Sequence, residues 1–163
     1  MAFKEGDIVK VKQGVIDPDF GGDIVGWQGE VSDFVDGNVC IDLDSISLSE
    51  CPDEYIKKCE EEGLDWEKIY LSAEDVEPAI SRDTPVNLRA TKKVIHLKHR
   101  WDHLGESSNR MHAVLKDINT TDEDEVMDAW EQYLRKKLSF PFAAEISEYL
   151  NNVPVQQGDK ITD

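Results

Sequence analysis

Short apolar segments separated by turn residues recur through the first 80 residues. They are residues 8–11, 24–31, 39–43 and 69–71, and residues 76–78 follow a short polar turn. In the third segment Val39, Ile41 and Leu43 alternate with Cys40 and Asp42. A period of two is typical of strands that bury one face and expose the other. The triplet Asp36-Gly37-Asn38 is a hairpin signal between the second and third segments. The pattern predicts an antiparallel meander of short strands.

A helical pattern interrupts this meander. Tyr55, Ile56 and Cys59 fall on one face of residues 52–62, Pro52 suits a first helical turn, and Gly63 suits a C-terminal cap. The sequence therefore predicts a helix inserted between two strands.

The segment after residue 85 mixes basic and apolar positions. Residues 86–97 fit either a strand or the start of a helix, and we predict a strand. Residues 106–118 place Met111, Val114, Leu115 and Ile118 on one helical face. This helix and the one that is predicted to begin at Thr121 are expected to pack together, joined by a short turn.

A second helix is predicted from Thr121 to about Leu138. A hydroxyl cap is followed by carboxylates at residues 122–125, and cations occupy residues 135–137, which suits the helix dipole at both ends. Pro141 cannot continue a helix, and Phe142, Ala144 and Ile146 then alternate with polar or small residues. We expect this helix to lead directly into a strand.

These elements predict a mainly β chain with added α-helices. Residues 1–80 are expected to form an acidic SH3-like barrel with an inserted helix, residues 81–85 a linker, and residues 86–163 a helical segment with a C-terminal Phe-Pro-Phe strand unit. The stretch Gly26-Trp27-Gln28-Gly29-Glu30-Val31 resembles SH3-like barrels of the KOW type.

The C-terminal quarter resembles a small bacterial family, the cyanobacterial-type calcium-binding proteins. The resemblance rests on Trp130, Tyr133, Leu134, Leu138, Phe140, Pro141, Phe142, Ala144, Glu145 and the later Gly158-Asp159. It implies calcium binding, and a strand that opens an acidic SH3-like barrel.

The formal net charge of -17 is unevenly distributed: residues 1–83 carry -15, residues 84–120 carry +4 and residues 121–163 carry -6. Such a field repels nucleic acid and anionic membranes, and it favours cations or a basic protein surface. No apolar run has the length of a signal peptide or a membrane span, so we expect a cytoplasmic protein.

The acidic loop of residues 17–23 is the predicted metal site. Asp17, Asp19 and Asp23 supply hard oxygens on a turn, and Asp42, Asp44 or Asp33 from neighbouring strands are expected to complete the calcium coordination. The alternative is that these are solvated turn acids. The acids of residues 121–128 are explained by the cap and the helix dipole.

Other candidate chemistry is weaker. His96, His99 and His103 would line one side of a helix and suit zinc or nickel, although ordinary histidines are the simpler interpretation. Cys40, Cys51 and Cys59 have neither disulfide nor zinc-knuckle spacing, and are expected to be buried thiols. No catalytic motif is present, so we expect a protein that is not an enzyme.

The leading functional hypothesis is a calcium buffer or sensor that uses surface carboxylates. The alternative is an acidic SH3-like interaction module that engages a basic partner. The turn Gly158-Asp159 repeats Gly6-Asp7, which predicts that the final strand pairs with the first barrel or with a second copy of the chain in a homo-oligomer. Phe140, Phe142 and Ile146 are expected to pack against the helices.

Overall fold

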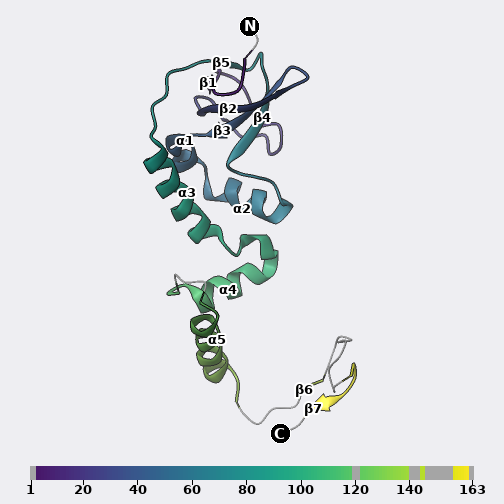
Figure 1. Ribbon diagram of the computed structural model, residues 1–163. Helices are drawn as coiled ribbons and strands as arrows, with labels where there is room; N and C mark the ends of the chain where they lie inside the picture. The colour runs from purple at the N-terminus through teal and green to yellow at the C-terminus, as the bar shows by residue number, and fades with distance from the viewer. Residues whose placement is uncertain (1–2, 119–121, 140–143, 146–155, 162–163) are drawn as a thin grey trace. The chain divides into compact units, whose positions relative to one another are not determined.

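The computed structural model describes residues 3–118, 122–139, 144–145 and 156–161 (Figure 1). The chain divides into two compact units, Met1–Ser108 and Asn109–Asp163. This division falls later in the chain than the linker expected at residues 81–85.

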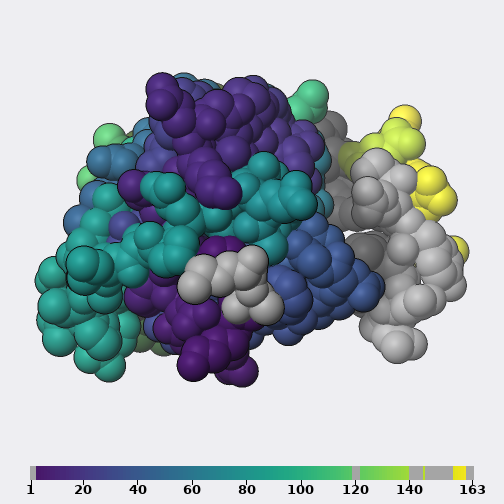
Figure 2. Space-filling model, turned by 90° about the horizontal axis from the view of Figure 1, so that it is seen from above, coloured from purple at the N-terminus to yellow at the C-terminus, as the bar shows by residue number. Residues whose placement is uncertain are grey.

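The first unit is built on a five-stranded antiparallel sheet with the strand order β4-β3-β2-β1-β5. The strands are β1 (Ile8–Val11), β2 (Gln28–Val35), β3 (Asn38–Leu43), β4 (Lys68–Ser72) and β5 (Val76–Pro78). Figure 2 shows the teal segment that contains β5 beside the purple N-terminal residues, in agreement with the β1–β5 pairing. The sheet is open, with β4 and β5 at its edges, so the predicted closed barrel is not confirmed.

The predicted hairpin between the second and third strands is confirmed. Asp36 (φ 51°) and Gly37 (φ 85°) both adopt left-handed backbone conformations, as a tight turn between twisted strands requires. The preceding strand begins at Gln28 rather than at the predicted residue 24, because residues 24–27 form a turn. Ile24 and Trp27 nevertheless belong to the core.

Alternation along the strands fills one hydrophobic core. Val9, Val11, Val31, Ile41 and Leu43 are each at most 1% exposed. Two helices, α1 (Ser45–Glu50) and α2 (Asp53–Glu62), contribute further core residues. The predicted inserted helix is confirmed as α2, and Gly63 provides its left-handed C-cap (φ 71°).

Residues 85–99 form a helix, α3 (Pro85–His99), so the predicted strand over residues 86–97 is wrong. The Thr84 side chain caps the helix by accepting a hydrogen bond from Asn87 N, and Pro85 occupies the first turn. The core-facing side chains Leu88 and Ile95 lie seven residues apart, a spacing that returns to one helical face. In Figure 1, α1, α2 and α3 lie below the sheet.

The segment before α3 is attached to the first unit. The carbonyl oxygen of Ile80 accepts a hydrogen bond from Gln28 Nε2 at 2.7 Å, and Asp83 Oδ2 accepts one from Ser45 N at 2.6 Å. A short 3-10 helix, η1 (Asp102–Ser107), follows α3 and contacts α2. The predicted helix at residues 106–118 therefore begins as η1, which bends at Gly105 (φ 55°).

The second unit contains α4 (Ser108–Leu115), α5 (Glu123–Lys137) and the short strands β6 (Ala144–Glu145) and β7 (Lys160–Ile161). The predicted acidic start and basic end of α5 are confirmed, with Asp122 rather than Thr121 as the capping side chain. Among the described residues, no helix has the length and apolar character needed to cross a membrane.

The final strand pairs within its own unit. Ala144 lies opposite Ile161, and Glu145 lies opposite Lys160. The predicted pairing with the first barrel is therefore wrong for this strand, and the predicted homo-oligomer through a second copy of the chain stays a prediction. Phe140, Phe142 and Ile146, which were expected to pack against the helices, lie outside the described residues.

The three cysteines are free and buried, as predicted. Burial, together with neighbouring anionic groups, raises the pKa of the Cys51 thiol to about 12 and that of Cys59 to about 11. Because the thiolate is the reactive form, we expect native protein at about pH 8 to react slowly with iodoacetamide and denatured protein to react at all three positions. Mass spectrometry counts the labelled sites; rapid labelling of native Cys51 would contradict its burial.

Candidate calcium-binding sites

The first candidate is the loop between β1 and β2. Its ends are held by two backbone hydrogen bonds, from Asp17 N to Gly22 O at 2.8 Å and from Gly21 N to Asp17 O at 3.0 Å. Asp17 is only 2% exposed, and its Oδ2 accepts a hydrogen bond from Phe20 N at 2.7 Å. Its Oδ1 is buried and has no hydrogen-bond partner among the described residues.

A buried carboxylate oxygen without a partner loses its hydration without compensation. A bound cation would restore that interaction. Asp19 and Asp23 are exposed, and Asp23 Oδ1 accepts a hydrogen bond from Val25 N at 3.0 Å. The loop therefore offers one buried carboxylate, which has an oxygen without a hydrogen bond among the described residues, and two exposed carboxylates.

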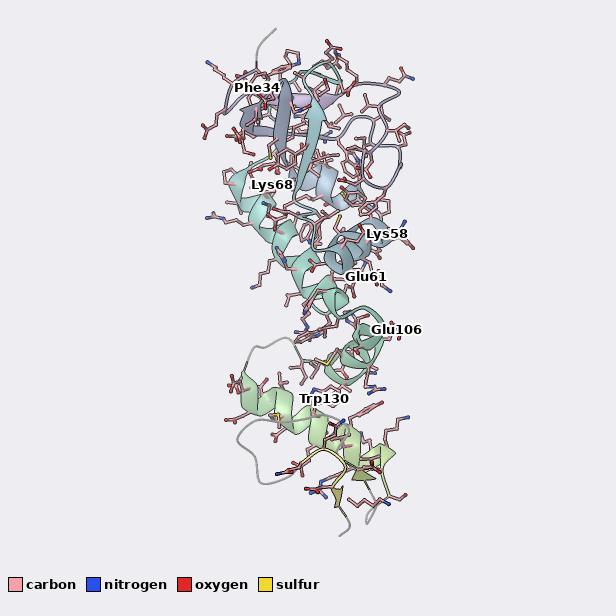
Figure 3. The ribbon with its side chains drawn as sticks, turned by 90° about the vertical axis from the view of Figure 1, so that its right-hand side faces the viewer. Phe34, Lys58, Glu61, Lys68, Glu106 and Trp130 are labelled. Atoms are coloured by element: carbon pink, nitrogen blue, oxygen red, sulfur yellow. The ribbon has the colours of Figure 1, made fainter. Side chains whose placement is uncertain are left out.

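Two of the predicted ligands, Asp42 in β3 and Asp44 at the N-cap of α1, already have partners of their own. Asp42 Oδ1 accepts a hydrogen bond from Ser32 Oγ at 2.9 Å and lies 3.8 Å from the ammonium of Lys68, which extends from β4 (Figure 3).

Asp44 caps α1 by accepting a hydrogen bond from Ser47 N. It also forms a bidentate ion pair with Arg82, with distances of 2.6 and 3.2 Å. Each of these two predicted ligands therefore has a cationic side chain beside it. Asp33 also lies on β2, and its Oδ1 accepts a hydrogen bond from Phe34 N.

The second candidate is an acidic hollow of about 330 Å³ between the end of α4 and α5. Glu125, Asp128 and Gln132 line it from α5, at a spacing that places them on one face of the helix. Asp117 contributes a third carboxylate from the chain that follows α4. We call this set the acidic hollow; its remaining lining residues are Val114, Ile118 and Ala129.

The chemistry of the acidic hollow suits a hard cation. Calcium binds six to eight oxygens, and carboxylate and side-chain amide oxygens are its common protein ligands. The helix dipole explains Glu125, which lies in the first turn of α5, but it does not explain Asp128 in the second turn. Sequence reasoning missed this site, although the spacing of Glu125, Asp128 and Gln132 was a readable signal.

The histidines do not gather into a transition-metal site. His96 Nε2 lies 2.7 Å from Glu67 Oε1, and its ring contacts Trp66. His99 is buried, with Nδ1 2.7 Å from Asp102 Oδ2. In the part of the chain that the structure describes, no three His, Cys, Asp or Glu side chains lie ready to hold a metal ion.

A protein-family model described as calcium binding matches residues 110–162. The match includes α5, with Trp130 labelled in Figure 3, and every residue on which the family resemblance was based. It confirms the resemblance to a calcium-binding family in the C-terminal part of the chain and indicates Ca²⁺ as the ligand. The searches of curated proteins and of solved structures gave no match.

Proposed function

We propose that this protein is a non-enzymatic calcium-binding protein, a buffer or a sensor, whose main site is the acidic hollow. The observation that carries the proposal is the calcium-binding family match over residues 110–162, which includes Asp117, Glu125 and Asp128. Oxygen donors from two segments of one unit are a suitable starting set for calcium. Because these carboxylates do not lie close enough to form a metal cluster, binding draws them together.

The loop containing Asp17, Asp19 and Asp23 is proposed as a second, weaker cation position. Its support is the partnerless buried Oδ1 of Asp17. Asp42 and Asp44 make no contribution to this position, because Lys68 and Arg82 already compensate their charges.

Calorimetric titration of the full chain with Ca²⁺, and separately with Mg²⁺, tests the function. We expect heat and a thermal shift with Ca²⁺ at micromolar to millimolar concentrations, and a weaker response to Mg²⁺, which tolerates irregular geometry poorly. A wild-type protein that gives neither signal at millimolar Ca²⁺ would refute the calcium proposal itself.

A double variant, Glu125→Gln with Asp128→Asn, tests whether calcium binds at the acidic hollow. Removing two of the three carboxylates of the acidic hollow should weaken Ca²⁺ binding at least about tenfold, since affinity follows ligand charge. Asp124→Asn is the matched control: it neutralises a carboxylate on the same helix that does not line the hollow. Equal losses in the double variant and the control would assign the effect to general charge, and normal binding by the double variant would move the site elsewhere.

Spectroscopy separates a sensor from a buffer. A sensor changes conformation when it binds calcium, whereas a buffer changes little. Saturating Ca²⁺ should alter the near-UV circular dichroism of Trp130 and Tyr133 if the unit is a sensor, because their rings pack 5.9 Å apart on α5.

A further inference from the structure

Helix α3 has a second apolar face, which is exposed to solvent. Val86 and Val94 are 66% and 65% exposed, and Leu97 is 39% exposed. Together with the exposed Ala90, they recur at intervals of three or four residues and so form a row along about three turns of the helix. We call these four residues the α3 stripe. Single exposed apolar side chains are normal, whereas a contiguous row of them marks an interaction surface.

A groove of about 410 Å³ adjoins the α3 stripe, where α3 packs on α1 and α2 (Figure 1). Ala90 and Val94 line it from α3. Leu48 of α1 and Ile56 of α2, which are 1% and 2% exposed, line it from the side of the core. The stripe and the groove therefore share two residues and make one apolar surface. A long apolar surface of this kind suits the apolar side of an amphipathic helix.

Two cations on α3 lie beside the stripe without a carboxylate partner. Arg89 and Lys93 are exposed, are one helical turn apart, and form no ion pair with any described residue. Lys92 and Lys98 of the same helix, by contrast, both pair with carboxylates. The helix itself contains no acidic residue. It therefore presents a positive surface on a unit whose first 83 residues carry a net charge of -15.

We propose that the α3 stripe and its groove bind an acidic amphipathic helix of another protein. The apolar side of that helix packs against Ala90 and Val94 and into the groove. Its carboxylates pair with Arg89 and Lys93, the cations that the chain itself leaves unpaired. Apolar burial supplies most of the affinity, and the charges favour an acidic partner over a basic one.

The distribution of charge disfavours other occupants. The stripe is only about 16 Å long, so an anionic membrane or a nucleic acid would extend beyond it and meet the acidic residues of the same unit. A second copy that docked through the same face would bring the unpaired cations of both copies together. One acidic helix covers the positive surface and little else.

A model peptide tests this surface on the full-length protein. The probe is a helical peptide of about 16 residues, with leucines at the spacing of the α3 stripe and glutamates and alanines elsewhere. A scrambled peptide of the same composition, which lacks an apolar face, is its control. We expect the scrambled peptide to bind at least about tenfold more weakly by fluorescence anisotropy. Amide NMR shifts should change mainly in residues 86–98. Equal binding of the two peptides, or shift changes confined to other segments, would overturn the proposal.

Substitutions on α3 separate the two contributions to binding. Val94→Ser should weaken binding of the probe about tenfold, because an apolar contact is lost. Arg89→Gln with Lys93→Gln should weaken it about threefold or more. All three side chains are exposed, so the fold should persist, which circular dichroism checks.

The matched control is Lys10→Gln with Lys57→Gln, which removes two positive charges from β1 and α2, away from the groove. This control should bind the probe as wild type does. A loss equal to that of the α3 double variant would assign the effect to net charge and refute the pairing with Arg89 and Lys93. Unchanged binding by Val94→Ser would refute the apolar contact.

Sedimentation of the full-length protein distinguishes a partner helix from a second copy. Any self-association of the wild type should be the same in Val94→Ser, because the proposed partner is a different protein. Dimerisation that Val94→Ser abolishes would instead identify a second copy as the occupant and overturn the proposal.

Discussion

Replacing Gly29 with alanine is expected to destabilise the first unit by about 3 kcal/mol. Gly29 lies in β2, opposite Val9 on β1 and Leu43 on β3. A Cβ atom at this position would lie 2.1 Å from the carbonyl oxygen of Asp42 and 2.8 Å from Cγ2 of Ile41. The nearest obstructing atom belongs to the backbone of β3, so β2 and β3 must move apart to make room for the added Cβ.

Urea unfolding, followed by tryptophan fluorescence, measures this loss. Gly22→Ala is the matched control, because a Cβ there meets no atom within 4 Å and the backbone is not left-handed. The control should change the free energy of unfolding by less than about 0.5 kcal/mol. A Gly29→Ala protein as stable as the control would contradict the close approach of β2 and β3.

The sequence predicted elements well wherever only one face is apolar. Val9 and Val11 on β1, and the alternation along β3, identify half-buried strands, and Gly63 correctly marks the end of α2. The prediction failed for α3 because this helix has apolar residues on its outer face as well. Val86 and Val94 are 66% and 65% exposed, so they obscure the helical period that Leu88 and Ile95 would otherwise show.

For the candidate sites, prediction from sequence was limited by tertiary contacts that no local pattern reveals. The sequence identified the loop at Asp17 as acidic, but the burial of its carboxylate depends on tertiary packing. No local pattern reveals that Arg82, 38 residues after the predicted ligand Asp44, forms an ion pair with it. The acidic hollow likewise depends on how the chain after α4 approaches α5, which brings Asp117 to the α5 side chains.

Replacing Asp44 with alanine is expected to cost about 2–3 kcal/mol of stability. The carboxylate accepts a hydrogen bond from Ser47 N at 2.7 Å, and loss of such a cap costs about 1 kcal/mol. It also pairs with Arg82, whose side chain is 33% exposed, so hydration offsets part of the loss of this partner. Chemical denaturation of the variant measures the combined loss of the cap and the ion pair as a decrease in the free energy of unfolding.

Asp42→Asn is the control for this substitution. Its carboxylate is 39% exposed and lies 3.8 Å from Lys68, a geometry whose contribution is below about 1 kcal/mol. If the free energy of unfolding of Asp44→Ala equalled that of Asp42→Asn, the ion pair with Arg82 and the cap on α1 would not contribute the expected stability.

The same residue separates structural stabilisation from metal binding. Asp44→Asn retains an oxygen that can accept from Ser47 N, but removes the charge that both Arg82 and a calcium ion would require. If Asp44 stabilises the fold through Arg82, this variant should lose stability while its calorimetric Ca²⁺ titration matches that of wild type. Loss of Ca²⁺ binding in a variant that remains folded would instead make Asp44 a ligand, with Arg82 as the cation that calcium displaces.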